Sequence, residues 1–366
     1  MVQQFYDISQ TEFTAGTILT PFDGKIPSKL GIRQNAANIK FPTRLNAMPI
    51  DRSAFLPDGS FIRPVGEIMV SLNKFVKVNT VCIGEKGGIL KTSDGTKRKG
   101  LVNHSYQIMC KALKESPSLF IEVNDEEVPW HSGFGSTGAT LGAVCASINE
   151  LYGNPLKNQD LIKYVMGNYG EQKENTDDKL LFVVSIGGST ATGLTKGGVV
   201  VLAGEGVPIG SMDYHGKVVL GIPNDYIIQT AEEQHIERMG PPKFNREKAE
   251  EESRRTAYTL LNKGLPKLVR GDISGISDQV FDNRFNGKGI SRCAPIFPRV
   301  VEIGQGVKSL YEDGHCDMLG MSSVGPAFFA LVDNERDQQK CVERFQGQNM
   351  RTEITTVCNS TYQREG

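Results

Sequence analysis

Apolar residues recur along the chain with two different periods, which predicts a mixture of strands and helices. Short runs with the alternation typical of strands cover 39–47 and 68–81, and a turn at 57–60 lies between them. Helical spacing follows at 104–113, and again where Leu141, Val144, Cys145, Ile148 and Leu151 recur every three or four residues. We therefore expect an antiparallel β-structure at the start and an α+β protein as a whole.

The same patterns organise the rest of the chain into two lobes. Strands are predicted at 118–123, 180–184, 199–202, 218–222 and 352–357, with a strand pair around 320–326. Helices are predicted at 139–152, 159–166, 246–261, 300–311 and 338–345. The glycine-rich stretches 84–100 and 187–193 have the composition of loops. We expect an N-terminal arm over 1–38, a first lobe over 39–205 and a second lobe over 206–366.

The predicted helix at 246–261 is unusually charged. Its apolar stripe is confined to Ala257, Leu260 and Leu261, near its end. The simplest interpretation of its run of glutamates is a face exposed to solvent.

Charge and composition narrow the class of partner. The 366 residues include 41 Lys and Arg against 42 Asp and Glu, a formal net charge of -1. No overall field therefore draws the chain to nucleic acid or to an anionic membrane. No stretch approaches the roughly 20 apolar residues of a membrane span. We expect a folded protein that binds small molecules, with no nucleic-acid or membrane partner.

Seven cysteines are scattered without a C-x-x-C pair, which is too sparse for a disulfide framework in a chain of this length. The first residues have neither the basic region nor the apolar stretch of a signal peptide. We therefore expect a cytoplasmic protein in which most of the thiols are buried.

The most informative stretch is a glycine-rich loop that runs into the predicted helix at 139–152. Gly133-x-Gly135-x-x-Gly138 matches the dinucleotide fingerprint, but Pro129 and the preceding acidic residues separate it from a strand, unlike a Rossmann unit. The loop could still bind a phosphate without a Rossmann unit, because unpaired N–H groups and the helix dipole favour an anion at the N-terminus of a helix. A purely structural glycine turn is the alternative.

Other signatures are missing or ambiguous. There is no G-x-x-x-x-G-K-[ST] and no complete G-x-S-x-G, and the five histidines have no metal-ligand spacing. His131 either orients a substrate or is a structural histidine. Arg44, Asp51 and Arg63 lie in a charged stretch that is usually only solvated, and Ser322 and Ser323 lie in a turn whose backbone their hydroxyls satisfy.

Taken in order, these three stretches resemble the motifs of the GHMP kinase superfamily. They are most similar to its non-kinase branch, the β-ribofuranosylaminobenzene 5'-phosphate synthases. Residues 42–46, 50–51 and 58–63 are similar to the branch's P-S-R-I-H, I-D and N-G-S-I-G-R. Residues 131–138 are similar to its H-S-G-L-G-S-G-T. Residues 320–326 are similar to its G-L-S-S-x-G-P. The departures are an insertion at 52–57, Phe134 in place of leucine, and looser versions of the family's glycine segments at 187–193 and 204–206.

The resemblance implies a two-lobed GHMP-kinase-like fold, with a ribosomal S5 domain 2-like N-terminal lobe and a ferredoxin-like C-terminal lobe. It also implies a homodimer and a reaction that joins phosphoribosyl diphosphate to an aromatic carboxylate such as 4-aminobenzoate, as in methanopterin biosynthesis. A C-glycoside forms, with loss of CO2 and diphosphate. A leaving diphosphate requires N–H donors and a divalent ion such as Mg²⁺, and the acceptor carboxylate requires a cation that orients it.

The implied roles fall on particular residues. Asp51 would stabilise the ribosyl cation or hold Mg²⁺, and Arg63 and Arg44 would clamp the 5'-phosphate or the acceptor carboxylate. The second lobe would line the cleft with Ser322, Ser323 and Gly325. The diphosphate loop would comprise His131, Ser132, Gly133, Gly135, Ser136, Thr137 and Gly138.

Three other functions stay open at this point. The first is an ATP-dependent GHMP small-molecule kinase that uses the same loop, although Gly138-Ala139-Thr140 replaces the usual double serine of those kinases. The second is the same synthase chemistry on a heteroaromatic acid in C-nucleoside biosynthesis. The third is a catalytically silent binding protein that has kept the fold.

Overall fold

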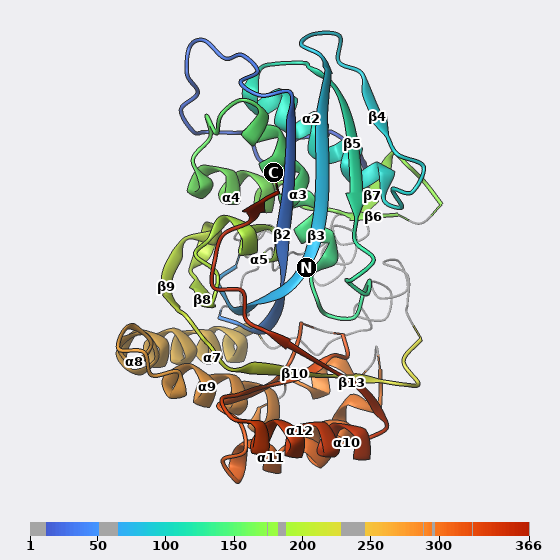
Figure 1. Ribbon diagram of the computed structural model, residues 1–366. Helices are drawn as coiled ribbons and strands as arrows, with labels where there is room; N and C mark the ends of the chain where they lie inside the picture. Colours follow the sequence, from blue (N-terminus) through green and yellow to red (C-terminus); the bar gives the residue numbers. More distant parts are fainter. Residues whose placement is uncertain are drawn as a thin grey trace.

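The computed structural model describes residues 12–50, 65–173, 175–181, 188–227, 246–287, 289–294, 297–323 and 325–365. In Figure 1 the chain forms an upper lobe around two long strands, β2 (Ala36–Pro49) and β3 (Glu67–Gly84), and a lower lobe around a smaller sheet. Predicted site residues Asp51 and Arg63 lie outside the described residues, as do Gly187 and the turn at 57–60.

The upper sheet is built on the antiparallel pairing of β2 and β3, which extends from Ala36 opposite Val81 to Pro49 opposite Glu67. Two register shifts interrupt it, one at Pro42/Thr43, where proline has no N–H to donate, and one between Asn46 and Met48. Both shifts flank the strand end that carries Arg44 and Asn46. The sheet is completed by β14 (Gln363–Arg364), β5 (Ser118–Asn124), β4 (Leu90–Thr92), β8 (Val199–Leu202) and β9 (Pro208–Met212).

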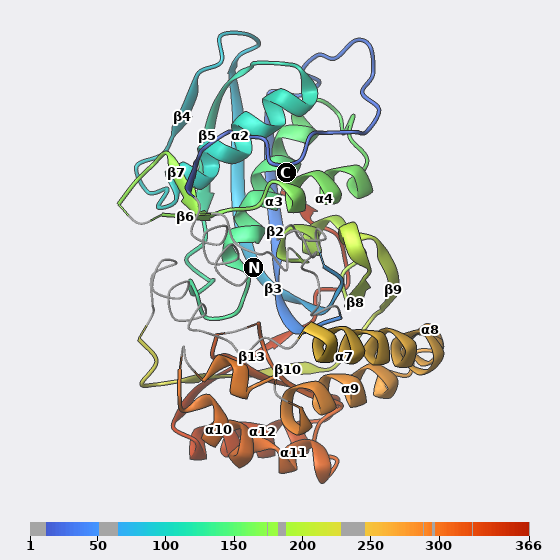
Figure 2. The ribbon, with the colours of Figure 1, turned by 180° about the vertical axis from the view of Figure 1, so that it is seen from behind.

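Helices cover one face of this sheet, as the reverse view in Figure 2 shows. They are α2 (Lys99–Leu113), α3 (Ser136–Leu151), α4 (Asn158–Gly167) and the short α5 (Gly188–Ala191). Every residue of α3 is buried, because the sheet lies on one side of it and α2, α4 and α5 on the others. The glycine-rich loop therefore feeds a helix in the middle of the lobe.

The described part of the N-terminal segment lies along the upper lobe. Strand β1 (Glu12–Thr14) pairs with β7 (Lys179–Leu181), which also pairs with β6 (Glu171–Gln172). The backbone N–H groups of Leu19 and Thr20 donate to the buried side chain of Asn168. The segment is thus attached by strand pairing and by a capped turn.

The lower lobe contains an antiparallel sheet in the order β11 (Met318–Met321), β12 (Phe328–Val332), β10 (Lys217–Pro223) and β13 (Met350–Thr356). Its outer face carries α10 (Val300–Val307), α11 (Ser309–Glu312) and α12 (Glu335–Gly347), which begins where the Asn334 side chain caps the N–H of Asp337. Towards the upper lobe lie α7 (Arg246–Thr259), a π-helical turn (Leu260–Gly264), α8 (Leu265–Val269) and α9 (Ser274–Phe281).

The two lobes share one apolar core. Along β10, Val218, Leu220 and Ile222 belong to the core that extends through the upper lobe, whereas Val219 packs under α10 and α12. This is the two-residue period of a strand with two buried faces. The lower sheet is therefore the floor of the upper lobe as well as the platform for the outer helices.

These observations confirm the expected α+β architecture and correct several local predictions. The stretch 84–100 is not simply a loop, because β4 pairs with β5 and α2 begins at Lys99. Residues 188–194 form α5 and a 3-10 turn rather than a loop. Of the predicted apolar stripe at 257–261, Leu260 is buried but Leu261 is 60% exposed. Strands β1, β4, β6, β9 and β14 and helices α8 and α9 were not predicted.

The lobe boundaries at 38/39 and 205/206 stay predictions. The seven cysteines all lie in the described part of the chain and form no disulfide there, and Cys145, Cys293, Cys316, Cys341 and Cys358 are buried. No helix among the described residues has both the length and the apolar character needed to cross a bilayer.

Candidate active site

Three segments that are far apart in the sequence meet at Gly133. The buried hydroxyl of Ser322, in the turn after β11, donates to the carbonyl oxygen of Gly133 at 2.5 Å and accepts the backbone N–H of Asn46 at 2.9 Å. The N–H of Ser323 in turn donates to the Asn46 carbonyl at 2.9 Å. One hydroxyl therefore joins β2, the glycine loop and the lower lobe.

The contact at this junction requires glycine. Gly133 has a φ of 96°, and a Cβ built on it would lie 2.5 Å from the carbonyl oxygen of Gly325 and 2.8 Å from that of Ser322. A Cβ on Gly138 would lie 1.9 Å from the Ser189 hydroxyl of α5. Any side chain at either position would push the loop away from its neighbours.

The glycine loop ends at the N-terminus of α3. Gly135 is the N-cap residue with left-handed backbone angles, and no side chain caps the first turn of the helix. The first N–H groups of a helix carry partial positive charge, so this end favours an anion. Phosphate binding by the loop stays a prediction, as does the alternative of a structural glycine turn.

A buried arginine stabilises the loop from the β2 side. The Arg44 guanidinium donates to the Gly133 carbonyl at 3.0 Å, and its backbone N–H donates to the Phe134 carbonyl at 3.2 Å. Arg44 is only 5% exposed, and burial lowers its pKa from the ordinary value, although the nearby Glu67 opposes this shift. Since arginine keeps its charge in proteins, Arg44 adds positive potential beneath the loop.

Glu67, the first residue of β3, is a fully buried carboxylic acid in the same region. One oxygen accepts the backbone N–H of Gly188 at the start of α5, and the other accepts the Asn46 amide. Burial raises the pKa of Glu67 to about 7, against the lowering effects of Arg44 and of these two hydrogen bonds. The Oδ1 of Asn46 is itself buried without a hydrogen-bond partner, so a protonated Glu67 could donate to it after rotation of the amide.

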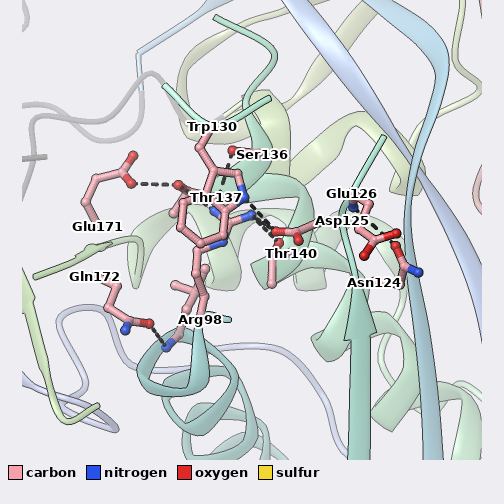
Figure 3. A network of polar contacts seen from close by, with 11 residues as sticks. Arg98, Asn124, Asp125, Glu126, Trp130, Ser136, Thr137, Thr140, Glu171 and Gln172 are labelled. Atoms are coloured by element: carbon pink, nitrogen blue, oxygen red, sulfur yellow. Dashed lines mark hydrogen bonds and ion pairs between the residues drawn. The ribbon is translucent and has the colours of Figure 1, made fainter. Parts of the chain in front are cut away.

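A second buried arginine, Arg98, lies beside the first turns of α3 (Figure 3). Its guanidinium forms an ion pair with Asp125 at 2.6 Å and donates to Thr137 at 3.1 Å and to Thr140 at 3.0 Å. The carbon at the centre of the guanidinium lies 4.7 Å from the Trp130 ring centroid, and the indole N–H also donates to Asp125. Arg98 thus links α2, β5 and the first turn of α3.

A carboxylate suited to a divalent ion also lies at the start of α3. Glu171 accepts the Thr137 hydroxyl at 2.6 Å with one oxygen and the Tyr169 hydroxyl with the other. Carboxylate oxygens are the ligands that Mg²⁺ prefers. Within the residues that the structure describes, no group of three or more His, Cys, Asp or Glu side chains could hold a metal by itself.

A third buried arginine holds the junction from the lower lobe. Arg284 donates to the carbonyl oxygens of Ala47 at 2.7 Å, Asn46 at 3.1 Å and Ser323 at 3.0 Å. Burial lowers its pKa to about 10. It therefore joins the π-helical turn after α9, at Asp282–Asn286, to the end of β2.

The structure brings most of the predicted site residues together. The glycine loop contains Gly133 and Gly135, and Arg44, Ser322 and Gly325 lie against it. The first turn of α3, which follows the loop, contains Ser136, Thr137 and Gly138. His131 and Ser132 precede it, with the His131 carbonyl accepting the Tyr226 hydroxyl at 3.1 Å and the Ser132 hydroxyl donating to the Trp130 carbonyl at 3.1 Å. Ser323 contributes backbone atoms here, with a φ of 56°.

Sequence reasoning missed Glu67, Arg98, Glu171 and Arg284. The only local signal is the basic composition around Arg98, and nothing in the neighbouring residues marks the other three as buried.

The comparisons with known proteins agree with this architecture. Residues 100–184 match the family model described as the GHMP kinases N terminal domain. No curated protein sequence matches the chain. The matched segment contains the glycine loop and α3.

Solved structures resemble the chain over nearly its whole length. A homoserine kinase from Cytophaga hutchinsonii has 17% identity and a TM-score of 0.63, covering 93% of this chain and 100% of its own. A mevalonate diphosphate decarboxylase from Staphylococcus aureus has 12% identity and a TM-score of 0.64, with 91% and 98% coverage. An L. major mevalonate kinase in complex with R-mevalonate has 12% identity and a TM-score of 0.55, with 90% and 99% coverage. The predicted GHMP-kinase-like fold is confirmed.

The first prediction from this site concerns pH. Native Glu67 keeps its proton to about pH 7, whereas in the unfolded chain it loses it near its ordinary pKa of 4.5. The folded state thus binds more protons than the unfolded chain between these two pH values. As the pH rises through this window, the free energy of unfolding of the wild type should fall by roughly 1.4 kcal/mol per pH unit relative to that of Glu67→Gln. Urea unfolding of both proteins from pH 4.5 to 8 measures this difference. Glu122→Gln, which removes an exposed carboxylate of β5, is the control, and parallel curves for wild type and Glu67→Gln would contradict the prediction.

The second prediction concerns the Arg98 network. Arg98→Met leaves Asp125 buried without its cation and should destabilise the protein by about 3–5 kcal/mol. The loss of unfolding free energy in the double variant Arg98→Met/Asp125→Asn should be smaller than the sum of the losses in the two single variants. Urea unfolding of the double-mutant cycle measures the coupling. The exposed pair Lys163 and Asp23, 2.8 Å apart, is the matched control and should give a coupling below about 1 kcal/mol. Additive effects at Arg98 and Asp125 would refute the network.

Proposed function

We propose that the protein transfers the ribosyl 5-phosphate group from phosphoribosyl diphosphate to the ring carbon of an aromatic carboxylate, with release of CO2 and diphosphate. The observation that carries this proposal is the hydroxyl of Ser322 between Asn46 and Gly133. It joins in space the three stretches that resemble the motifs of the β-ribofuranosylaminobenzene 5'-phosphate synthases. The proposed activity is thus a pentosyl transfer by an enzyme of the GHMP superfamily.

The diphosphate is the group that the glycine loop suits best. The backbone N–H groups lie at the start of α3, and the buried charge of Arg44, on β2, contacts the loop that leads into this helix. Both stabilise negative charge that develops on a leaving diphosphate. Thr137 contributes its N–H rather than its hydroxyl, because the hydroxyl already contacts Arg98 and Glu171.

The residues at the start of α3 also fit a divalent ion. Mg²⁺ is commonly bound through one or two carboxylates together with substrate phosphates, and Glu171 supplies such a carboxylate beside Thr137. The ion would neutralise charge on the diphosphate. Asp51, from the I-D motif, is the second proposed ligand or the group that stabilises the ribosyl cation.

The reaction balances in two coupled changes. The bond between C1 of the ribose and the diphosphate oxygen breaks, and the diphosphate leaves with the electron pair. The acceptor carbon that carries the carboxylate forms the new C–C bond, and the electrons of its bond to CO2 return to the ring. Arg63 is proposed to bind the 5'-phosphate, and the junction of Gly133 and Ser322 excludes water at the loop.

An ATP-dependent small-molecule kinase is the second candidate. The similarity to homoserine kinase and mevalonate kinase folds favours it, and the same helix end would take the phosphates of ATP. A heteroaromatic acid in place of a 4-aminobenzoate-like acceptor is a variant of the first proposal. Homodimer formation and a cytoplasmic location stay predictions.

The third prediction separates the two donors by ligand stabilisation. Phosphoribosyl diphosphate with Mg²⁺ should raise the melting temperature, because a ligand that binds only the native state stabilises it by mass action. ATP with Mg²⁺ should have little effect. Release of ¹⁴CO2 from a panel of labelled aromatic acids then identifies the acceptor. Stabilisation by ATP alone, with ATP consumption and no CO2 release, would favour the kinase and reject the proposal.

The fourth prediction tests Asp51. Asp51→Asn should lower CO2 and diphosphate release by at least about 100-fold, since it removes the charge proposed to stabilise the transition state. The melting temperature without ligand should change little, which circular dichroism measures. Asp94→Asn, in the segment between β4 and α2, controls for the loss of one carboxylate. Wild-type turnover in Asp51→Asn would remove Asp51 from the mechanism.

A further inference from the structure

A cavity of about 540 Å³ lies between α7 and the end of β2. Met48 and Ile50 form its wall on the upper-lobe side, and Arg255, Thr256, Thr259 and Lys263 form the wall on the side of α7 and the following turn. Its size is within the range of about 300–1,000 Å³ typical of small-molecule sites. The cavity is thus large enough for a single-ring acid.

The side of α7 that lines this cavity is polar. Arg255, Thr259 and Lys263 lie four residues apart, so they share one side of the helix and its π-helical extension. Arg255 and Lys263 are exposed, and Thr256 and Thr259 are partly buried. The cavity is therefore open to solvent on this side, and a small polar ligand can enter it.

The charges of the wall are suited to an anion with a hydrogen-bond donor. Arg255 and Lys263 form no ion pair with any residue that the structure describes. Glu252 and Asp282 also line the cavity, and Asp282 accepts the Asn286 amide at 2.8 Å. Arg255 and Lys263 could bind the carboxylate of a ligand, and Glu252 and Asp282 could accept hydrogen bonds from its amino group. The apolar side chains of Met48 and Ile50 could pack against the face of its ring.

The cavity and the candidate active site lie at the same end of β2. Met48 follows Asn46 and Ala47, whose carbonyl oxygens bind Arg284. Asn46 also accepts the N–H of Ser323 and donates its own N–H to Ser322, which contacts Gly133. A ligand in the cavity and a diphosphate at the loop would therefore lie against the same end of β2, as a transfer between two substrates requires.

We propose that this cavity binds the acceptor, an aromatic carboxylate, and that Arg255 and Lys263 bind its carboxylate. This rests on the proposed function, and it assigns to these two cations the role that the motif resemblance left to Arg44 or Arg63. Arg44 is engaged under the glycine loop, and it is only 5% exposed.

The test combines binding and kinetics for wild type and Arg255→Gln/Lys263→Gln. Titration calorimetry with 4-aminobenzoate, in the presence of phosphoribosyl diphosphate and Mg²⁺ at a temperature where turnover is negligible, should show at least a tenfold weaker Kd for the double variant. The KM for the acid should rise by a similar factor, with the KM for phosphoribosyl diphosphate unchanged. Arg254→Gln, on the neighbouring exposed position that contacts Glu250 at 4.0 Å, is the matched control and should behave as wild type.

The outcomes separate the cavity from the proposed reaction. Unchanged Kd and KM in the double variant, with CO2 released by wild type, would overturn the cavity assignment and leave the reaction standing. Binding that the double variant loses, with no CO2 released by wild type, would support the cavity as an acid site and overturn the reaction. Failure of wild type to bind any acid of the panel would overturn the assignment. Thr256→Trp, which fills the cavity from α7, should abolish binding, and retained binding in this folded variant would also overturn it.

Discussion

The contact between Ser322 and Gly133 is the constraint on which the rest of the site depends. The hydroxyl of Ser322 both donates and accepts, so it fixes β2, the glycine loop and the lower lobe in one geometry. The contact leaves no room for a Cβ at Gly133. Because the loop cannot move away from the lower lobe, the N-terminus of α3 is held at the seam between the lobes. Residues of both lobes therefore surround this helix end.

Buried charge surrounds this junction, and that is costly unless each group has partners. Arg98 and Arg284 meet the requirement with a carboxylate, hydroxyls and carbonyl oxygens. Glu67 meets it with two hydrogen bonds and a pKa near neutrality. Such groups hold the loop in place before any ligand binds, which is the preorganisation that electrostatic catalysis requires. The site thus depends on interactions made by residues outside the motifs.

The fold itself leaves the reaction open. Kinases and a decarboxylase share this architecture with the chain at 12–17% identity, and a common fold hosts different chemistries through different sites. We propose that the acceptor side differs and that in this protein it includes the polar side chains of α7 that line the cavity. If the donor and the acceptor bind at the end of β2, proteins with this fold could keep the donor site and catalyse different reactions through different acceptor sites.

The sequence by itself determined the elements whose stability is local. The strands β2 and β3, the buried helix α3 and the glycine loop before it all follow from periodicity and glycine placement, and the motif order indicated which segments meet. It could not place Arg98, Glu67 or Arg284, because whether a charged side chain is buried depends on partners that are distant in the chain. The sequence also could not predict the strand within the stretch 84–100. Its composition is typical of a loop, but residues 90–92 form a strand because they pair with β5. On α7 the acidic residues indicated a solvated face, yet Glu252 lines the cavity. Only the tertiary structure decided this, since the strand end opposite the helix comes from residues about 200 positions earlier in the chain.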